Sequence, residues 1–249
     1  MKTALITGGA ARIGAQIAKT LHNNDFNIII HCNQSKDKAQ LLCDELNLLK
    51  EKSAKVVVGN LNNIDSISTI VESIESIDLL VNNASVFYPL SVDESDSENW
   101  DNILDVNLKA PFFLSKGLSQ KLNSSEGSII NIIDIHADRP LKKHSVYNIS
   151  KAGLKMLTLT LAKELAPSIR VNGVSPGSIL WPQEGAEISE LDKSIMLERI
   201  ALKRQGSPQD IADTVLFLAN SNYLTGQIIN VDGGRTLNQY TIPLNLNVV

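Results

Sequence analysis

The sequence alternates short apolar runs with longer amphipathic runs along most of its 249 residues. The short runs are rich in Ile, Val and Leu, with little alternation of polar and apolar residues, as is typical of strands buried on both faces. They predict strands at residues 3–7, 26–31, 55–58, 78–81, 128–133, 169–174 and 227–231. Between them, runs of helical periodicity predict helices at 12–22, 37–49, 64–73, 98–122, 145–165 and 208–218.

This repeated succession of strand and helix predicts an α/β fold. We expect one doubly wound, Rossmann-type parallel sheet of about seven strands, with right-handed crossovers and helices on both faces. Since no linker, low-complexity segment or short repeat divides the sequence, residues 1–249 are predicted to form a single domain. The stretch at about 178–206 lacks a strand pattern, and we expect it to form a substrate lid over the carboxyl edge of the sheet.

Composition and charge narrow the range of functions. A formal net charge of −4 gives no reason to expect nucleic acid or an anionic membrane as a partner. No apolar run approaches the roughly 20 residues of a membrane span, and the first residues enter a strand pattern directly, without room for a signal peptide. Cys32 and Cys43 are too few for a disulfide framework and have no metal-ligand spacing. We therefore expect a cytoplasmic protein without a metal site.

Three side chains form a candidate acid–base cluster. Tyr147 and Lys151 lie four residues apart in the predicted helix 145–165, which places a phenol and an ammonium on one helix face. A cation beside a phenol lowers the phenol's pKa and makes the hydroxyl a better proton donor. Asp134 follows the predicted strand 128–133, at the sheet edge where ligands bind. Considered alone, Asp134 is more readily explained as a helix or turn cap, so its role depends on its neighbours.

The first strand-to-helix turn carries a glycine pattern, Thr7-Gly8-Gly9-Ala10-Ala11-Arg12-Ile13-Gly14. Glycine permits a tight turn and close approach of a pyrophosphate, which the N-terminus of the following helix attracts. The spacing T-G-x-x-x-x-G resembles the cofactor turn of the short-chain dehydrogenase/reductase family. Three further motifs match that family in order: Asn82-Asn83-Ala84, with Ser85 in place of a glycine, Asn107, and Pro176-Gly177.

The resemblance covers nearly the whole chain and implies an oxidoreductase that uses NADP(H). The implied catalytic residues are Asn107, Asp134, Tyr147 and Lys151. The implied cofactor contacts are Gly8, Arg12, Ile13, Gly14, Asn33, Ser35, Asn60, Leu61, Asn83, Ala84, Ser85, Tyr147, Lys151, Pro176, Gly177 and Ser178.

The choice between NADPH and NADH depends on the end of the second strand. Residues 31–36 carry no carboxylate, which would bind a ribose 2′-hydroxyl and repel a 2′-phosphate. Arg12 and Lys36 could supply positive charge, so we expect NADPH/NADP. Related reductases often carry arginine where Gln34 stands, which leaves the preference open.

Asp134 stands where most of the family has a serine that donates to a ketone oxygen. An ionised aspartate cannot donate and would repel the charge that develops on that oxygen. It suits a substrate rich in N–H groups, and residues 83–89, 132–141 and 177–182 resemble the pteridine reductases. That resemblance implies reduction of dihydropterins to tetrahydropterins, and of dihydrofolate as a further candidate, with Tyr147 as proton donor assisted by Asp134. The implied substrate contacts are Arg12, Ser85, Phe87, Asp134, Tyr147, Leu180 and Trp181.

Two alternative functions stay open. A ketone-directed reductase of the same fold, such as a 3-oxoacyl-thioester reductase, would share every motif except Asp134 and Phe87. An NADP(H)-sensing module without catalysis would have no need of the implied catalytic residues. The apolar segment 240–249 has no evident place in a monomer, so we expect it to dock on a neighbouring subunit of a homo-oligomer, a tetramer by the family resemblance.

Overall fold

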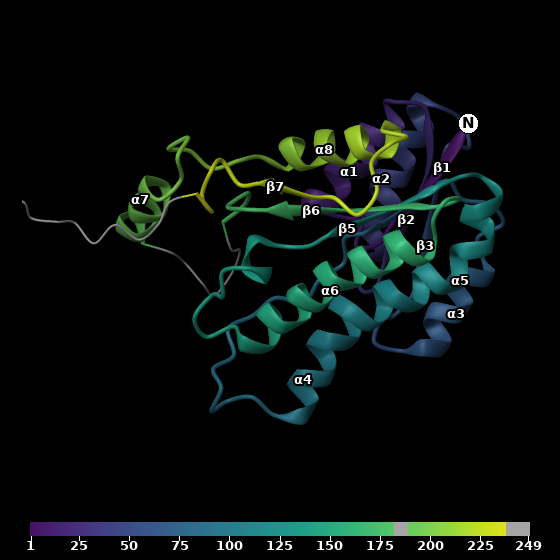
Figure 1. The fold of residues 1–249 in the computed structure, drawn as a ribbon. Coiled ribbons are helices and arrows are strands. Elements are labelled where there is room, and N and C mark those ends of the chain that lie inside the picture. Colours follow the sequence, from purple (N-terminus) through teal and green to yellow (C-terminus); the bar gives the residue numbers. More distant parts are fainter. Residues whose placement is uncertain (182–188, 238–249) are drawn as a thin grey trace, which may run out of the picture.

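The structure is a computed structural model that describes residues 1–181 and 189–237, and at its centre lies a seven-stranded sheet (Figure 1). All neighbouring strands pair in parallel. The strands are β1 (Lys2–Ile6), β2 (Phe26–Cys32), β3 (Ala54–Val58), β4 (Leu79–Asn82), β5 (Ser128–Ile132), β6 (Arg170–Pro176) and β7 (Ile228–Val231). The predicted α/β fold with a doubly wound parallel sheet is confirmed.

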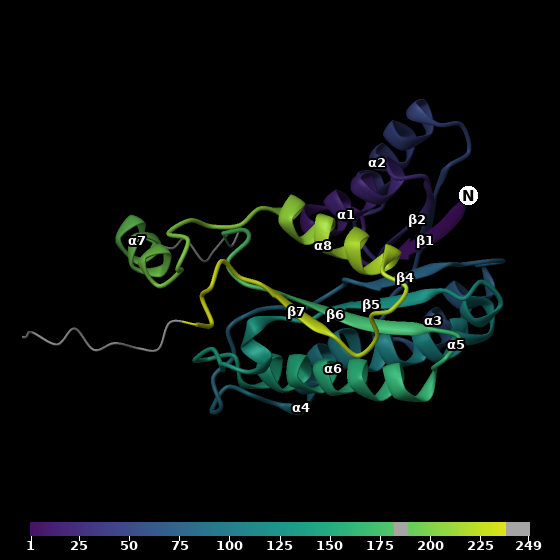
Figure 2. The same ribbon diagram turned by 45° about the horizontal axis from the view of Figure 1, so that its top comes forward.

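Helices cover both faces of this sheet, as Figures 1 and 2 show. One face packs against α1 (Arg12–His22), α2 (Lys36–Leu49) and α8 (Pro208–Asn220). The other packs against α3 (Ile64–Glu72), α5 (Ala110–Ser124) and α6 (Ser145–Glu164). In β1, Ala4 and Ile6 belong to the first apolar layer and Leu5 to the second. Because successive side chains of a strand point to opposite faces, a sheet covered on both sides needs the continuous apolar runs seen in the sequence.

The sheet order is β3-β2-β1-β4-β5-β6-β7, so the chain reverses its direction of travel at β1. Leu5 of β1 is paired with Ile29 of β2 on one side and with Leu80 of β4 on the other. The connections after β1 and β4 leave toward opposite sides and open a crevice between the carboxyl ends of the two strands. This point of strand-order reversal is where a ligand site is expected.

The predicted helix 98–122 is three elements instead of one. These are α4 (Ser97–Leu104), a π-helical turn η1 (Asp105–Lys109) and α5. Pro111 lies in the first turn of α5 and has no N–H to donate to the carbonyl of Asn107, four residues earlier. The apolar periodicity passes through this interruption, so the sequence pattern did not reveal it. The wider turn contains Asn107, and π-helical turns are frequent at functional sites.

The predicted lid at about 178–206 contains α7 (Glu190–Glu198), a helix that the sequence pattern did not predict. It begins after Ser189, whose side chain accepts a hydrogen bond from the Asp192 N–H. In Figures 1 and 2, α7 stands beyond the carboxyl ends of the strands. Residues 182–188 of the predicted lid and the predicted docking segment 240–249 lie outside the described residues. None of the described helices is long and apolar enough to cross a membrane.

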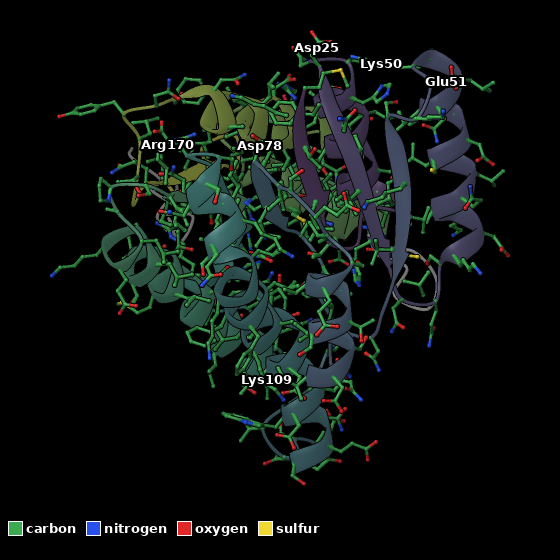
Figure 3. All side chains as sticks on the ribbon, turned by 90° about the vertical axis from the view of Figure 1, so that its right-hand side faces the viewer. Asp25, Lys50, Glu51, Asp78, Lys109 and Arg170 are labelled. Carbon is green, nitrogen blue, oxygen red and sulfur yellow. The ribbon has the colours of Figure 1, made fainter. Side chains whose placement is uncertain are left out.

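At the opposite edge, Arg170 joins the start of β6 to the end of α8. Figure 3 looks onto this edge and labels Arg170. Its Nη1 donates to the Leu218 carbonyl at 2.9 Å and its Nη2 to the Ala219 carbonyl at 2.8 Å. The last carbonyls of a helix have no partner within the helix, and a cation there also interacts favourably with the helix dipole. Arg170 therefore stabilises the packing of α8 on the sheet.

We predict that Arg170→Met lowers the free energy of unfolding by about 2 kcal/mol, because two charge-assisted hydrogen bonds are lost while the aliphatic part of the side chain is kept. Urea denaturation of the two proteins gives the difference. Lys38→Met, at an exposed position of α2, is the matched control and should change stability little. Equal losses in the two variants would contradict the assigned role of Arg170.

Candidate active site

The glycine turn between β1 and α1 is fixed by contacts from two neighbouring strands. Gly8 has a φ of +61°, a conformation that favours glycine, and its N–H donates to Nδ1 of His31 at 3.2 Å. The side-chain amide of Asn83 donates to the carbonyls of Thr7 at 2.8 Å and Gly8 at 3.2 Å. At Gly14 a Cβ atom would overlap the Gly8 carbonyl. The turn is therefore rigid, and its close packing requires glycine.

Thr7 and the start of α1 complete this side of the crevice. The Thr7 hydroxyl oxygen accepts hydrogen bonds from the N–H groups of Asn83, at 2.9 Å, and Ala84, at 3.0 Å, which ties the end of β1 to the end of β4. The residue before α1 is Ala11, which offers no side-chain cap, and the first turn of α1 has no acidic residue. A helix N-terminus without a cap favours an anion, such as a phosphate group.

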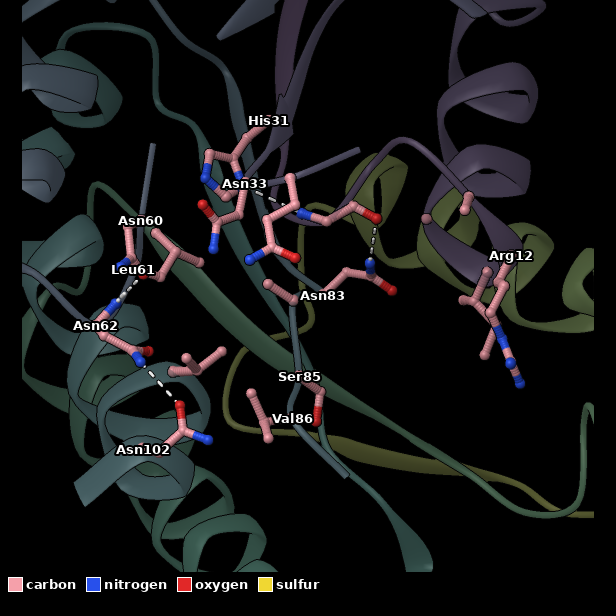
Figure 4. Close-up of a pocket in the computed structure, with 17 residues that line it drawn as sticks. Arg12, His31, Asn33, Asn60, Leu61, Asn62, Asn83, Ser85, Val86 and Asn102 are labelled. Atoms are coloured by element: carbon pink, nitrogen blue, oxygen red, sulfur yellow. Dashed lines mark hydrogen bonds between the residues drawn. The ribbon is translucent and has the colours of Figure 1, made fainter. Parts of the chain in front are cut away.

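A cavity of about 610 Å³ lies at this point of strand-order reversal (Figure 4). Its volume suits a bound small molecule. The predicted cofactor residues that line it are Gly8, Arg12, Ile13, Gly14, Asn33, Asn60, Leu61, Asn83, Ala84 and Ser85. The lining residues that the sequence prediction missed are Ala11, His31, Gln34, Asn62, Val86, Asn102 and Val106. Ala11 and Val86 could have been predicted from the sequence, because they are next to predicted residues in the chain. Asn102 and Val106 could not, because they reach the cavity only through the packing of α4 and η1.

His31 is a buried residue of β2 and part of the cavity wall. Its Nε2 lies 3.1 Å from the Gly59 carbonyl, and its Nδ1 accepts the Gly8 N–H. Burial lowers the pKa of His31 to about 4, although the Gly59 carbonyl acts in the opposite direction. At neutral pH the ring is therefore uncharged, with Nε2 as donor and Nδ1 as acceptor, and it holds the glycine turn in place.

The candidate acid–base group is a direct pair of Tyr147 and Asp134. The Tyr147 hydroxyl donates to Oδ2 of Asp134 at 2.7 Å, while Oδ1 of Asp134 accepts the His136 N–H at 2.8 Å. Burial, followed by the charge and hydrogen bond of Asp134, raises the pKa of Tyr147 well above its usual value, and a hydrogen bond with the Ser85 side chain acts in the opposite direction. The lowering of this pKa that was expected from the Lys151 ammonium is therefore wrong. Tyr147 is protonated at neutral pH and can serve as an acid.

Lys151 is the most deeply buried charged side chain in this part of the structure, with 2% of its surface exposed. Its Nζ donates to the Ile132 carbonyl at 3.0 Å and lies 5.7 Å from the centre of the Tyr147 ring. Burial lowers the pKa of Lys151 to about 8, and the charge of Asp134 acts in the opposite direction. The predicted cluster of Asp134, Tyr147 and Lys151 is thus brought together at the carboxyl edge of the sheet.

Asn107 is completely buried and joins the substrate side of the crevice to α6. Its Oδ1 accepts the Val86 N–H at 2.7 Å, and its Nδ2 donates to the Val86 carbonyl and to the Ser150 hydroxyl, both at 3.0 Å. The Ser150 hydroxyl in turn donates to the backbone carbonyl of Tyr147. Asn107 therefore sets the position of the loop after β4 relative to Tyr147.

Phe87 lies on the same loop and contacts the Tyr147 ring edge to face, with ring centres 4.8 Å apart. Its other contact is a stack on His144, at 4.7 Å and an interplanar angle of 18°. About 49% of Phe87 is exposed, so its ring is available to a ligand beside the Tyr147 hydroxyl. The order of the residues along the chain gives no sign that His144 lies beside Phe87.

Eleven predicted site residues do not line this cavity. Five of them were described above: Phe87, Asn107, Asp134, Tyr147 and Lys151. The other six are Ser35, Pro176, Gly177, Ser178, Leu180 and Trp181. Ser178 lines a separate cavity of about 430 Å³ with residues of 201–206 and 230–234. The backbone carbonyl of Trp181 lies 3.5 Å from Nη2 of Arg12, and its ring lies 5.8 Å from the ammonium group of Lys193. The functional roles of all the predicted site residues stay predictions.

Comparison with known proteins identifies relatives along nearly the entire chain. Residues 8–236 match a family described as enoyl-(acyl carrier protein) reductase. The chain is 37% identical to the 3-oxoacyl-[acyl-carrier-protein] reductase FabG of Staphylococcus epidermidis, over 94% of this chain and 98% of that protein. Proteins of the same name from Staphylococcus aureus and Rickettsia bellii are 34% and 35% identical, over 94% of this chain and 97% and 96% of their own lengths.

These relatives show that the sequence-based prediction of a pterin reductase is wrong. They are named as 3-oxoacyl reductases, which is the alternative that the sequence had left open. The structure supplies the physical reason. Each oxygen of Asp134 already accepts a hydrogen bond within the protein, from His136 or from Tyr147. The carboxylate is thus explained as a turn cap and a partner of the phenol, and it does not require an N–H-rich substrate.

The buried ammonium of Lys151 leads to a prediction about stability and pH. Between pH 8 and 10 the unfolded chain keeps a proton on Lys151 that the folded protein releases, so the free energy of unfolding should rise with pH, by at most about 1.4 kcal/mol per pH unit. Below about pH 8, Lys151 is protonated in both the folded and the unfolded state, so the folded protein bears the full free-energy cost of burying the charge. Lys151→Met should lack this dependence. A stability difference between the two proteins that stays constant from pH 8 to 10 would contradict the prediction.

Proposed function

The chain belongs to the short-chain dehydrogenase/reductase family, and from that premise we propose that it uses NADPH to reduce the ketone of a 3-oxoacyl thioester. The observation that carries the proposal is the protonated Tyr147 hydroxyl beside the buried Lys151, at the carboxyl edge of the sheet. A protonated phenol at that place can deliver a proton to a carbonyl oxygen. The names of the relatives support an acyl chain on an acyl carrier protein as the substrate.

The residues around the cavity fit a nicotinamide dinucleotide phosphate. The glycine turn leaves room for a pyrophosphate beside the uncapped N-terminus of α1. Among the described residues, none that lines the cavity is acidic, and Arg12 is a lining cation, which supports NADPH over NADH. By the family resemblance, Tyr147 and Lys151 would hold the nicotinamide ribose. NADPH supplies the hydride when it is bound.

The chain's own part in the reaction is to orient the carbonyl and to supply a proton. Tyr147 donates that proton, a role worth about 10²–10⁴ in rate. Burial and the negative charge of Asp134 raise the pKa of Tyr147 and so keep the phenol protonated before the reaction. An ionised Asp134 cannot replace the serine hydroxyl that most of the family has at this position. Ser85, which stands where the family motif has glycine, brings a hydroxyl to Tyr147 and would be the second donor to the carbonyl oxygen.

Further parts of the proposal concern the lid and the assembly. We infer from the family resemblance that the described parts of the predicted lid, residues 178–181 and 189–206 with α7, close over the bound substrate and that four copies assemble into a homotetramer. Leu180 and Trp181 would then contact the acyl chain. Sedimentation of a species with the mass of one chain only would contradict the assembly.

A panel of substrates tests the proposed function. NADPH oxidation is followed with acetoacetyl-CoA, crotonyl-CoA and dihydrobiopterin, where the two thioesters separate ketone reduction from enoyl reduction. We expect turnover of acetoacetyl-CoA, lowered by about 10²–10⁴ in Tyr147→Phe. Turnover of crotonyl-CoA or dihydrobiopterin without turnover of acetoacetyl-CoA would overturn the proposal.

The pair of Asp134 and Tyr147 predicts the pH dependence of the reaction. Asp134→Asn removes the negative charge that raises the pKa of Tyr147, so the loss of kcat at alkaline pH should begin at a lower pH than in the unmodified protein. Asp138→Asn is the matched control, because Asp138 pairs with the ammonium of Lys155. An alkaline limb that stays in place in Asp134→Asn would show that Tyr147 does not control it.

A further inference from the structure

Three polar side chains are hydrogen-bonded to one another in the apolar layer between the sheet and α6. Asn82 of β4 and Asn131 of β5 are paired in the sheet, and Nδ2 of Asn82 donates to Oδ1 of Asn131 at 2.8 Å. Nδ2 of Asn131 donates to the hydroxyl oxygen of Thr158 on α6, also at 2.8 Å. All three side chains are buried. We call Asn82, Asn131 and Thr158 the buried trio.

The buried trio is not explained by stability alone. The Thr158 hydroxyl donates its one proton to the Leu154 carbonyl at 2.8 Å, so its oxygen accepts from the NH₂ group of Asn131. The carbonyl oxygen of Asn131 must then accept from the NH₂ group of Asn82. This leaves Oδ1 of Asn82 buried and without a hydrogen-bond partner among the described residues. Because such an atom lowers stability, apolar side chains of the same shape would be at least as stable here.

The buried trio supplies one of three polar attachments between α6 and the segment formed by β5 and the residues after it. Side chains on one face of the helix make all three. The bonds are Tyr147 to Asp134, Lys151 to the Ile132 carbonyl, and Thr158 to Asn131. Apolar contacts are not directional, whereas a hydrogen bond has a narrow range of lengths and angles. These bonds therefore fix the position of α6 along β5.

The bond between Asn131 and Thr158 is the least adjustable of the three. Lys151 reaches its carbonyl through four methylene groups, and under the proposed function the Tyr147 hydroxyl gives up its proton during the reaction. Thr158 is branched at Cβ, so its hydroxyl has one stiff rotatable bond. Asn131 and Thr158 are also completely buried, with 0% of their surface exposed. Their bond therefore holds α6 in place while the other two side chains act.

The other end of the buried trio leads to the second proposed donor. Asn82 ends β4, and Ser85 follows three residues later. Asn131 thus lies between the strand that leads to the Ser85 hydroxyl and the helix that carries the Tyr147 hydroxyl. These two hydroxyls are hydrogen-bonded to each other. Their separation depends on how far α6 lies along the sheet.

We infer that Asn131 and Thr158 are positioning residues that set the separation of two hydroxyls, those of Ser85 and Tyr147, so that both reach one carbonyl oxygen. The inference rests on the proposed reduction of a ketone. Asn131 and Thr158 are buried inside the fold and act through β4 and α6. A displacement of about 1 Å in such a group costs about 10²-fold in rate.

Thr158→Val tests the inference, because valine has nearly the shape of threonine but lacks the hydroxyl that Asn131 needs as an acceptor. A single turnover of NADPH with saturating acetoacetyl-CoA should be slowed by about 10²-fold. Thr158→Ser keeps a hydroxyl at this place and should keep the rate.

A second readout of Thr158→Val needs no substrate. When Tyr147 moves away from the charge of Asp134, the pKa of Tyr147 falls. ¹³C NMR of labelled tyrosine should therefore show the Tyr147 phenol ionising at a lower pH in Thr158→Val than in the unmodified protein. A group that only stabilised the fold would leave this titration in place.

Two controls separate positioning from stability. Asn172 is completely buried on β6, and its side chain bonds backbone groups of the segment before β7. Asn172→Leu should lower stability but leave the rate and the Tyr147 titration unchanged. The combined variant Asn82→Leu, Asn131→Leu, Thr158→Val leaves no member of the trio unpaired, so it should fold even if Thr158→Val does not. It should react as slowly as we expect of Thr158→Val.

An unchanged rate or an unchanged titration in Thr158→Val would overturn the inference. Equal losses in Thr158→Ser or Asn172→Leu, or a normal rate in the combined variant, would also overturn it. If the unmodified protein does not reduce acetoacetyl-CoA, the proposed function fails, and the titration of Tyr147 still decides whether Asn131 and Thr158 position this phenol.

Discussion

The pairing of β1 with both β2 and β4 is the constraint on which the site depends. It places the carboxyl ends of β1 and β4 side by side while their connections leave toward opposite faces of the sheet. The Thr7 hydroxyl then bonds the backbone after β4, and the Asn83 amide bonds the glycine turn after β1. Side chains far apart in sequence meet at this edge because parallel strands all end there.

At that edge, one carboxylate and one hydroxyl group surround the phenol of Tyr147. A carboxylate at Asp134 holds the proton of Tyr147 and caps a short 3₁₀ turn, η2 (Ile135–Ala137). A hydroxyl at Ser85 approaches the same phenol from the loop after β4. Under the proposed function, the hydroxyl that donates to the carbonyl oxygen comes from Ser85, on the loop after β4, instead of from the position of Asp134, just after β5. Asn107 keeps the Ser85 hydroxyl near the phenol, because its two hydrogen bonds to the Val86 backbone hold that loop in place.

The sequence predicted the strands and the sheet type because apolar periodicity is a local property of the chain. It predicted the cluster of Asp134, Tyr147 and Lys151 because the carboxyl ends of parallel strands meet at one edge of the sheet. It did not predict the π-helical turn at Asn107 or the bond from Asn62 to Asn102, since these depend on packing between distant segments. The pterin substrate was inferred from the residue type at position 134. The hydrogen bonds that satisfy this carboxylate within the protein were not visible in the sequence.

Burial and the charge of Asp134 keep Tyr147 protonated, and direct titration of that phenol tests this role. Tyrosine labelled with ¹³C at the ring carbon that bears the hydroxyl gives one NMR signal per residue, and Tyr147→Phe identifies the signal of Tyr147. We expect this signal to remain that of a neutral phenol beyond pH ~10, where an ordinary tyrosine ionises. Ionisation of Tyr147 below that pH would contradict it.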